Sequence, residues 1–363
     1  MPLKITKGRS LPIGLDPGTS AVKAAQFRFA DGELELLAAG SAPIPRPCRD
    51  NFDKRLEAIA DGLRGILKAN DFKGRQCALS LPACQSFVHH VRIPKLPPEQ
   101  INLAVQRELQ GKLPYPIRDA MIRHVIVGDI YGEAEPKQEV IVVAAARKTL
   151  GAYLAMTRRV GLNVVTIDVE PCAVVECFQR LFRRATDAQR PILYIDMGAA
   201  STQVVLSHGP QIVFARNLAK GGEQLDQAVA KGMQISLEQA CATRIDLLRA
   251  DSQTGQAGHE LYRFLDSPLS DIAEELNQCL RYHDSVFRNQ SVERVIFVGG
   301  QAYDRRLCQT LAQQLNLPAQ IGDPLVRVKR VEGAGLAIGL DRREPQPDWA
   351  VAVGLSLGAS QAA

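Results

Sequence analysis

Aromatic side chains are scarce in this sequence: they make up 5% of its 363 residues, with a single tryptophan. Proteins that bind single-stranded nucleic acid combine a basic groove with aromatic stacking platforms. Here the basic residues stand in short separate clusters, and the formal net charge of +5 is small for the length. We therefore expect no nucleic-acid partner and expect most of the basic clusters to be solvated.

A long apolar run is also missing. The sequence contains no stretch of about 18 uncharged apolar residues, the length that crosses a bilayer. Its first ten residues include Lys4, Lys7 and Arg9 but no apolar signal core. These two absences predict a cytoplasmic protein.

Patterns for disulfides and zinc are absent too. The eight cysteines include no Cys-x-x-Cys pair, and Cys77 and Cys279 lie in apolar stretches, so we expect reduced, buried thiols. The six histidines are scattered except for His89-His90, which would point to opposite faces of a strand. The sequence therefore favours neither a disulfide framework nor a protein-only metal site.

What the sequence does contain is a pair of Asp-x-Gly turns. Each turn follows a short apolar run and leads into another strand-like stretch, so each is predicted to open a β-hairpin. A lone copy is usually only a polar hairpin turn, whereas two copies in matched contexts favour a two-lobed nucleotide clamp. The two turns are Asp16-Pro17-Gly18-Thr19-Ser20 and Asp196-Met197-Gly198, the second followed by Ser201-Thr202.

These turns carry groups that suit phosphate. Gly18 and Gly198 can adopt φ > 0 and let the backbone approach a ligand, while the neighbouring hydroxyls and amides offer donors. Asp16 and Asp196 are candidates to hold Mg²⁺ through its waters, because that ion takes few protein carboxylates. A third element is an apolar strand that ends at Gly299-Gly300, where a nucleoside could lie flat against the backbone.

The order of these motifs resembles the phosphate-1, phosphate-2 and adenosine motifs of the actin, hexokinase and Hsp70 superfamily. Within it the chain is similar to the PilM family of type IV pilus assembly proteins, which is close to the cell-division protein FtsA. Stretches that carry this resemblance over nearly the whole chain include Ser80-Leu81-Pro82, Arg92-Ile93-Pro94-Lys95-Leu96, Asp168-Val169-Glu170-Pro171 and Val351-Ala352-Val353-Gly354-Leu355.

The resemblance implies an α/β fold with two actin-like, ribonuclease-H-like lobes and an inserted subdomain of the FtsA and PilM type. The first lobe is predicted over residues 12–91 and 162–190, and the inserted α+β subdomain over 92–161. The second lobe is predicted over residues 191–217 and 290–363, with a helical subdomain over 218–289. Within the inserted part we expect a helix from Glu99 to Lys112, two strands separated by a 132–137 loop, and a helix from Thr149 to Val160.

The family motifs imply a binding site for ATP and Mg²⁺. Its nucleotide-contacting residues would be Asp16, Gly18, Thr19, Ser20, Lys23, Asp196, Gly198, Ser201, Thr202, Gly221, Gly222, Arg244, Gly299 and Gly300, with Asp16 and Asp196 at the metal.

The junction before a predicted helix at 173–184 offers a further polar group. In superfamily members this junction can place such a group near the attacking water, and the resemblance implies Glu170 or Asp168 for that catalytic role here. Alternatively, Asp168 caps the helix and Glu170-Pro171 occupy its first turn, where both residue types are favoured.

Several positions depart from the family pattern. Pro17 replaces an aliphatic residue and removes one backbone donor from the first turn. Arg244 stands where relatives usually have Lys, Gln203 where they often have Asp, and Asp226 where they often have Thr. We therefore expect ATP binding with slow or absent hydrolysis.

The resemblance also implies partners. The main one would be the N-terminal cytoplasmic peptide of PilN, captured by the inserted subdomain, with Ile101, Val105 and Leu109 as a groove wall or, alternatively, as mere core. Other proteins of the pilus inner-membrane platform and self-association are further options, and the location would be cytoplasmic and peripheral to the inner membrane. Alternatives are an FtsA-like filament-forming membrane adaptor, a small-molecule kinase of the same superfamily, or a scaffold that has lost nucleotide binding.

Overall fold

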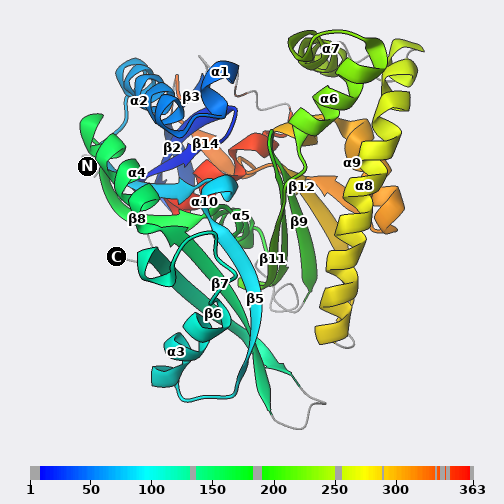
Figure 1. The fold of residues 1–363 in the computed structure, drawn as a ribbon. Helices are drawn as coiled ribbons and strands as arrows, with labels where there is room; N and C mark the ends of the chain where they lie inside the picture. The colour runs from blue at the N-terminus through cyan, green and yellow to red at the C-terminus, as the bar shows by residue number, and fades with distance from the viewer. Residues whose placement is uncertain are drawn as a thin grey trace. The chain divides into compact units, whose positions relative to one another are not determined.

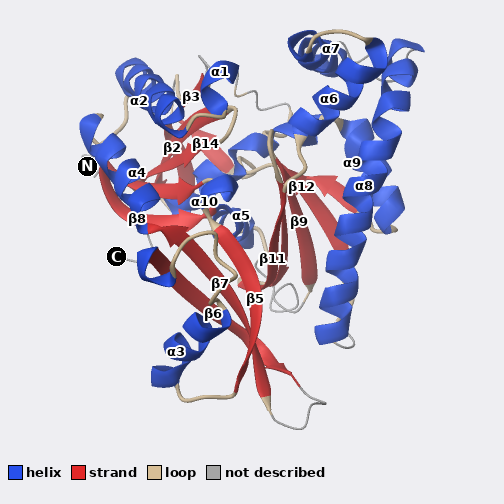
Figure 2. Cartoon of the chain, viewed as in Figure 1, coloured by secondary structure: helices blue, strands red, loops and turns tan. Residues whose placement is uncertain are grey.

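The computed structural model describes residues 9–130, 136–182, 190–249, 256–287, 290–331, 333–335, 340 and 344–359. The chain forms two compact units, residues 1–183 with 323–363 and residues 184–322. Each unit is built around its own sheet, and Figures 1 and 2 show the course of the chain through both.

Unit 1 contains a six-stranded sheet with the order β14-β3-β2-β1-β4-β8. The first three strands in sequence form an antiparallel meander, whereas β4 and β8 run parallel to β1. Asp31 and Gly32, with φ of 51° and 78°, make the tight turn between β2 and β3, for which Asp-Gly is a typical sequence. The strands are β1 (Ile13–Pro17), β2 (Ala21–Ala30), β3 (Glu33–Pro43), β4 (Gln76–Leu81), β8 (Asn163–Val169) and β14 (Val328–Arg330).

One face of this sheet is covered by the amphipathic α2 (Phe52–Ala69), which follows the short α1 (Arg46–Arg49). Asn51 caps α2 by accepting a hydrogen bond from the Lys54 amide at 3.0 Å. The apolar face of α2 packs with Ile13 and Leu15 of β1 and with Tyr153 of α4 (Arg147–Arg159) in one core.

The opposite face of the sheet packs against α10 (Ala350–Gly358), which also contacts α5 (Glu170–Gln179). These backbones approach very closely: a Cβ on Gly14 would lie 1.9 Å from the Ala352 carbonyl oxygen, and one on Gly354 would lie 1.8 Å from that of Ala173. Any side chain at Gly14 or Gly354 would force the two backbones apart.

The position of the C-terminal stretch differs from the prediction. Residues 323–363, expected in the second lobe, cluster with unit 1. The reason is strand pairing and packing: β14 pairs in parallel with β3, and α10, preceded by the 3₁₀ turn η7 (Pro347–Trp349), buries its apolar surface on β1 and α5.

Unit 1 also carries a three-stranded antiparallel sheet with the order β5-β7-β6. One face packs against α3 (Pro98–Glu108), and this small core contains Ile101, Val105 and Leu109, which are at most 3% exposed. These three residues are therefore core, as the alternative interpretation had it. The strands are β5 (Phe87–Pro94), β6 (Ala120–Ile130) and β7 (Lys137–Ala146), with the 3₁₀ turns η1 (Ala83–Gln85) and η2 (Ile117–Asp119) beside them.

The limits of this part differ from the prediction in two respects. The sheet begins at Phe87, so His89-His90 belong to it, and α4 contributes to the core of the larger sheet instead. The helix predicted over 99–112 ends at Glu108, before Gly111 takes a left-handed φ of 77°. Residues 132–135 of the predicted 132–137 loop lie outside the described residues.

Unit 2 contains a five-stranded sheet with the order β11-β10-β9-β12-β13. Its topology repeats that of unit 1: an antiparallel three-strand meander followed by two strands parallel to the first. This repetition supports the predicted duplicated α/β architecture. The strands are β9 (Pro191–Met197), β10 (Thr202–His208), β11 (Gln211–Leu218), β12 (Arg294–Val298) and β13 (Ala319–Ile321).

The helices of unit 2 are α6 (Gly222–Met233), α7 (Leu237–Arg249), α8 (Gln256–Val286) and α9 (Arg305–Leu315), with the 3₁₀ turn η5 (Gly300–Tyr303). A proline at 268 would favour a helix start there, but α8 begins at Gln256 and contains Pro268 in its interior. Leu261, Leu265 and Leu269 are at most 4% exposed, so burial of a continuous apolar stripe outweighs the helix-breaking tendency of proline.

Candidate functional site

The first predicted turn joins β1 to β2, with Asp16 paired to Lys23 and Pro17 to Val22. Gly18 does not adopt the expected positive φ. A Cβ at this position would lie 3.0 Å from the Ala21 carbonyl oxygen, so the close backbone approach, not backbone handedness, favours glycine here.

Asp16 is 8% exposed, and burial raises its pKa to about 6. The positive charges of Lys23 and Arg55 lower this pKa, while the negative charge of Asp348 raises it. The environment therefore disfavours the ionised carboxylate unless further positive charge lies close to Asp16.

Lys23 reaches a segment that the sequence gave no reason to place beside it. Its Nζ donates to the Asp348 carbonyl oxygen at 2.7 Å and lies 2.8 Å from the Asp348 carboxylate. The same ammonium lies 5.9 Å from the centre of the Trp349 ring. The Lys23 side chain, a predicted phosphate contact, is thus held by a residue 325 positions away in sequence.

Arg55 of α2 is a second residue that the motifs did not identify. Its guanidinium is 4% exposed and donates to the carbonyl oxygens of Pro17 and Gly18, both at 3.2 Å, and to Cys84 Sγ at 3.1 Å. A buried cation on α2 therefore fixes two carbonyl groups of the first turn by hydrogen bonds.

The two predicted catalytic carboxylates lie at the start of α5. Asp168 Oδ1 accepts from the Val169 amide at 2.8 Å, and burial raises the pKa of Asp168 while this amide and Cys172 lower it. The N-cap of α5 is Val169, with no side-chain cap, so the expectation that Asp168 caps this helix is wrong at that position. Glu170 occupies the first helical position beside Pro171, as the alternative to a catalytic role predicted. Glu170 also interacts electrostatically with Arg55.

The second turn joins β9 to β10, where Asp196 pairs with Gln203. Gly198 again lacks a positive φ, and its amide donates to the Ser201 carbonyl oxygen at 2.9 Å. Thr202 Oγ1 donates to the Lys220 carbonyl oxygen at 2.7 Å. These bonds make the turn a rigid loop at the carboxyl end of β9.

The start of α6 is fastened to this turn. The Gly222 amide donates to the Gly198 carbonyl oxygen at 3.0 Å, and the Glu223 amide donates to that of Ala199 at 2.7 Å. Gly221 must be glycine, since a Cβ there would lie 2.6 Å from the Ser201 nitrogen. The structure therefore brings the predicted Gly221-Gly222 pair onto the second turn, with the helix N-terminus beside it.

The end of β12 meets the same turn. Gly299 has φ of 85°, and a Cβ there would lie 2.3 Å from Asp196 Oδ1 and 2.6 Å from the Met197 carbonyl oxygen. Gly300 differs, because a Cβ on it would meet nothing within 4 Å. Gly299 is thus required for the backbone to pass the Asp196 carboxylate, whereas Gly300 is not sterically required.

Arg244 has a different environment from the one expected of a nucleotide contact. Its Nη1 donates to Asp226 Oδ1 at 2.6 Å and to the Gly222 carbonyl oxygen at 3.0 Å, and its Nη2 donates to Gln301 Oε1 at 2.6 Å. The Arg244 and Asp226 side chains are only 6% and 7% exposed. Two of the sequence departures therefore form one buried ion pair that ties α7 to α6 and to η5.

The residues at each of the two turns, judged within their own unit, fit a phosphate group with magnesium. At the second turn, glycines allow the backbone to pack closely around the Asp196 carboxylate, and the N-terminus of α6 lies on the same loop, a surrounding that suits phosphate oxygens. In the described ranges no group of three or more His, Cys, Asp or Glu could hold a metal ion. An ion here would be held mainly by phosphate and water, which is the usual habit of Mg²⁺.

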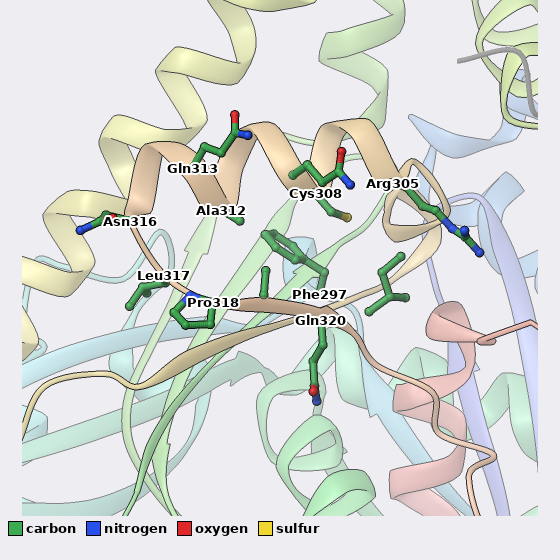
Figure 3. Close-up of a pocket in the computed structure, with 12 residues that line it drawn as sticks. Phe297, Arg305, Cys308, Ala312, Gln313, Asn316, Leu317, Pro318 and Gln320 are labelled. Atoms are coloured by element: carbon green, nitrogen blue, oxygen red, sulfur yellow. The ribbon is translucent and has the colours of Figure 1, made fainter. Parts of the chain in front are cut away.

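Unit 2 also has an open pocket of about 790 Å³ between α9 and the β12–β13 edge. Figure 3 shows Gln313 and Asn316 on the helix side and Pro318 and Gln320 on the strand side. None of the predicted nucleotide-contacting residues lines it. Its lining gives no support for a nucleotide there.

Among the helices that the structure describes, none has the combined length and apolarity needed to cross a bilayer.

Known proteins share this architecture. The family model for type IV pilus assembly protein PilM matches residues 14–360. The cell-division protein FtsA of Enterococcus faecalis is 20% identical over 284 residues, 68% of this chain and 60% of that protein's length. The FtsA alternative is not favoured, because the pilus family model covers far more of the chain.

Solved structures show the same fold. A PilM-PilN type IV pilus biogenesis complex superposes with a TM-score of 0.78 and 23% identity, over 96% of this chain and 98% of the other. The ethanolamine utilization protein EutJ from Carboxydothermus hydrogenoformans gives a TM-score of 0.55 and 13% identity, over 98% and 91% of the two chains. With the family model spanning nearly its whole length, this chain belongs to the PilM family of type IV pilus assembly proteins.

Proposed function

We propose that this chain binds ATP with Mg²⁺ and that the bound nucleotide sets its affinity for a partner in type IV pilus assembly. The observation that carries the nucleotide proposal is the second turn: Asp196 lies beside Gly299, while Gly221 and Gly222 are packed against the same loop. These glycines let the backbone segments pack closely, and the packing sets the Asp196 carboxylate and the N-terminus of α6 on one loop, a surrounding that favours a metal-bound phosphate.

The roles of the residues follow from their positions. Bound Mg²⁺ would neutralise phosphate charge, and Asp196 would orient its water ligands at the second turn, the role that we also propose for Asp16 at the first turn. The α6 N-terminus would favour the negative phosphates, since helix N-termini carry partial positive charge. Asp168 accepts a hydrogen bond from the neighbouring Val169 amide, and Glu170 interacts electrostatically with Arg55 of α2, which supports slow or absent hydrolysis.

Calorimetry with Asp196→Asn tests this site. We expect the wild-type chain to bind ATP in the presence of Mg²⁺ and the variant to lose most of the magnesium-dependent affinity. Asp271→Asn, at an exposed position of α8 in the same unit, is the matched control and should bind as the wild type does. Unchanged ATP affinity in Asp196→Asn would refute the assigned role.

We propose further that the β5-β7-β6 sheet and α3 capture the N-terminal cytoplasmic peptide of PilN. The similar solved structure is described as a PilM-PilN complex, which supports this partner. Because Ile101, Val105 and Leu109 are core, the contacts would come from exposed apolar side chains instead. Leu103 on α3 and Val125 on β6, which are 52% and 48% exposed, are available for this purpose.

Such a partner would hold the chain at the inner membrane and bring it to other platform proteins. Leu103→Asp and Val125→Asp test the surface by titration with a synthetic PilN peptide. Phe29→Asp, at a 52% exposed apolar position of β2, is the control for a general loss of surface hydrophobicity. We expect the first two changes to weaken peptide binding and the control to leave it intact; equal effects at all three positions would exclude a specific surface on this sheet.

A further inference from the structure

The contacts of Arg55 give the first turn a support that the sequence motifs do not include. Arg55 projects from α2, and its Nη2 bridges two consecutive carbonyl oxygens, those of Pro17 and Gly18. Its Nη1 donates to Cys84 Sγ, so three acceptors on two segments surround one guanidinium. Lysine could not reproduce this arrangement, because it has one nitrogen where Nη1 and Nη2 donate from two separate positions.

Peptide geometry turns these contacts into a statement about the amides of the turn. In a trans peptide the carbonyl and the N–H of the same plane point in opposite directions. The Pro17 carbonyl shares its plane with the Gly18 N–H, and the Gly18 carbonyl shares its plane with the Thr19 N–H. When Arg55 holds both carbonyls, it directs both amides away from α2, which is the orientation of a small anion-binding nest.

The charge of Arg55 matters as well. Pro17 has no N–H, so the first turn has one fewer backbone donor than a turn with an aliphatic residue there. A guanidinium that is 4% exposed lies directly behind this turn, in a surrounding where charge is poorly screened. It also interacts with Asp16 and with Glu170, so a single cation is shared by the turn and the start of α5.

We propose that Arg55 is a positioning residue for phosphate binding, which fixes the Pro17-Gly18-Thr19 backbone with its amides directed outward and offsets the donor that Pro17 lacks. This rests on the proposed nucleotide function. Arg55 itself does not touch the phosphate; it acts through the two peptide planes.

The test compares Arg55→Lys and Arg55→Met with the wild type. Arg64→Met serves as the control, because Arg64 lies on the same helix with a side chain 55% exposed. Affinities for ATP with Mg²⁺ and for adenosine are measured by calorimetry, and amide hydrogen exchange is followed in the segment 16–22. Adenosine has no phosphate and therefore reports damage unrelated to the proposed role.

We expect Arg55→Lys to bind ATP about tenfold to a hundredfold more weakly, since charge-assisted hydrogen bonds to phosphate lose their geometry. Adenosine affinity should stay unchanged, exchange in segment 16–22 should accelerate, and Arg64→Met should behave as the wild type. If Arg55→Met does not fold, Arg55→Lys decides the question.

Two outcomes overturn the inference. One is that the wild type binds ATP and the Arg55→Lys variant binds it with the same affinity. The other is unchanged exchange in segment 16–22, whatever the nucleotide result. A wild type that binds no ATP refutes the proposed nucleotide function instead, and with it the phosphate role of Arg55.

Discussion

The Arg244–Asp226 pair allows a quantitative prediction about stability. Both side chains are almost fully buried and their charged atoms lie 2.6 Å apart. Removing one partner of a buried pair leaves an uncompensated charge and costs about 3–5 kcal/mol, whereas removing both costs much less. We therefore expect Arg244→Met to lower the free energy of unfolding of unit 2 by about 3–5 kcal/mol.

Replacing the other member of the pair, Asp226, should lower the free energy of unfolding by less. In Asp226→Asn the guanidinium keeps its hydrogen bonds to the Gly222 carbonyl oxygen and to Gln301, whereas Arg244→Met strands the Asp226 carboxylate. The double variant Arg244→Met with Asp226→Leu should recover about 2 kcal/mol relative to the single Arg244→Met change, which is a coupling typical of residues in direct contact.

Urea unfolding followed by circular dichroism measures these differences, provided the denaturant slope is unchanged among the variants. Arg216→Met is the matched control, because the Arg216–Glu275 pair of the same unit is 43% and 28% exposed and should contribute less than about 1 kcal/mol. An Arg244→Met effect as small as that of the control would refute the view that the pair holds α6, α7 and η5 together.

Three further predictions concern single positions. Because burial raises the folded-state pKa of Asp16 from 3.8 to about 6, its contribution to stability is present below pH 4 and lost as the pH rises through 6. Asp16→Asn should thus be more stable than the wild type at pH 7.5, by on the order of 2–3 kcal/mol, and equally stable near pH 4, while binding ATP with Mg²⁺ more weakly; equal unfolding free energies at both pH values would contradict this. Gly299→Ala should lower the melting temperature and abolish ATP binding, since its Cβ would meet Asp196 Oδ1 at 2.3 Å, while Gly300→Ala should do neither; calorimetry on the pair distinguishes them. Burial lowers the pKa of His208 to about 4, so stability should fall as the pH drops from about 6.5 toward 4, and His208→Gln should reduce that fall in acid titrations of unfolding.

Local patterns predicted much of the fold. The Asp31-Gly32 turn and the apolar face of α2 were readable because each depends on residues close in sequence. The two Asp-x-Gly hairpins were readable for the same reason. Helix limits were less predictable, since Pro268 argues for a boundary that the buried stripe of α8 overrides.

The candidate site was only partly predictable. Gly221 and Gly299 lie against the second turn as the motif order suggested. Asp348 and Arg55 were missed because their contacts join segments that lie 325 and 37 or 38 positions apart and leave no short motif. The Arg244 interaction with Asp226 was also unreadable, although both residues had been noticed as departures: nothing local in the sequence shows that two unusual residues 18 positions apart compensate each other.

The close packing of α10 on β1 has a consequence for how the protein is made. Gly14 and Ala352 are in backbone contact, so the central strand of unit 1 gains the helix α10 only after residues 350–358 have left the ribosome. Unit 2 is continuous in sequence and can fold earlier, since domains fold as units during synthesis. During synthesis, unit 2 of the nascent chain can therefore be folded while unit 1 is still incomplete. Limited proteolysis of ribosome-stalled chains would report this order of folding.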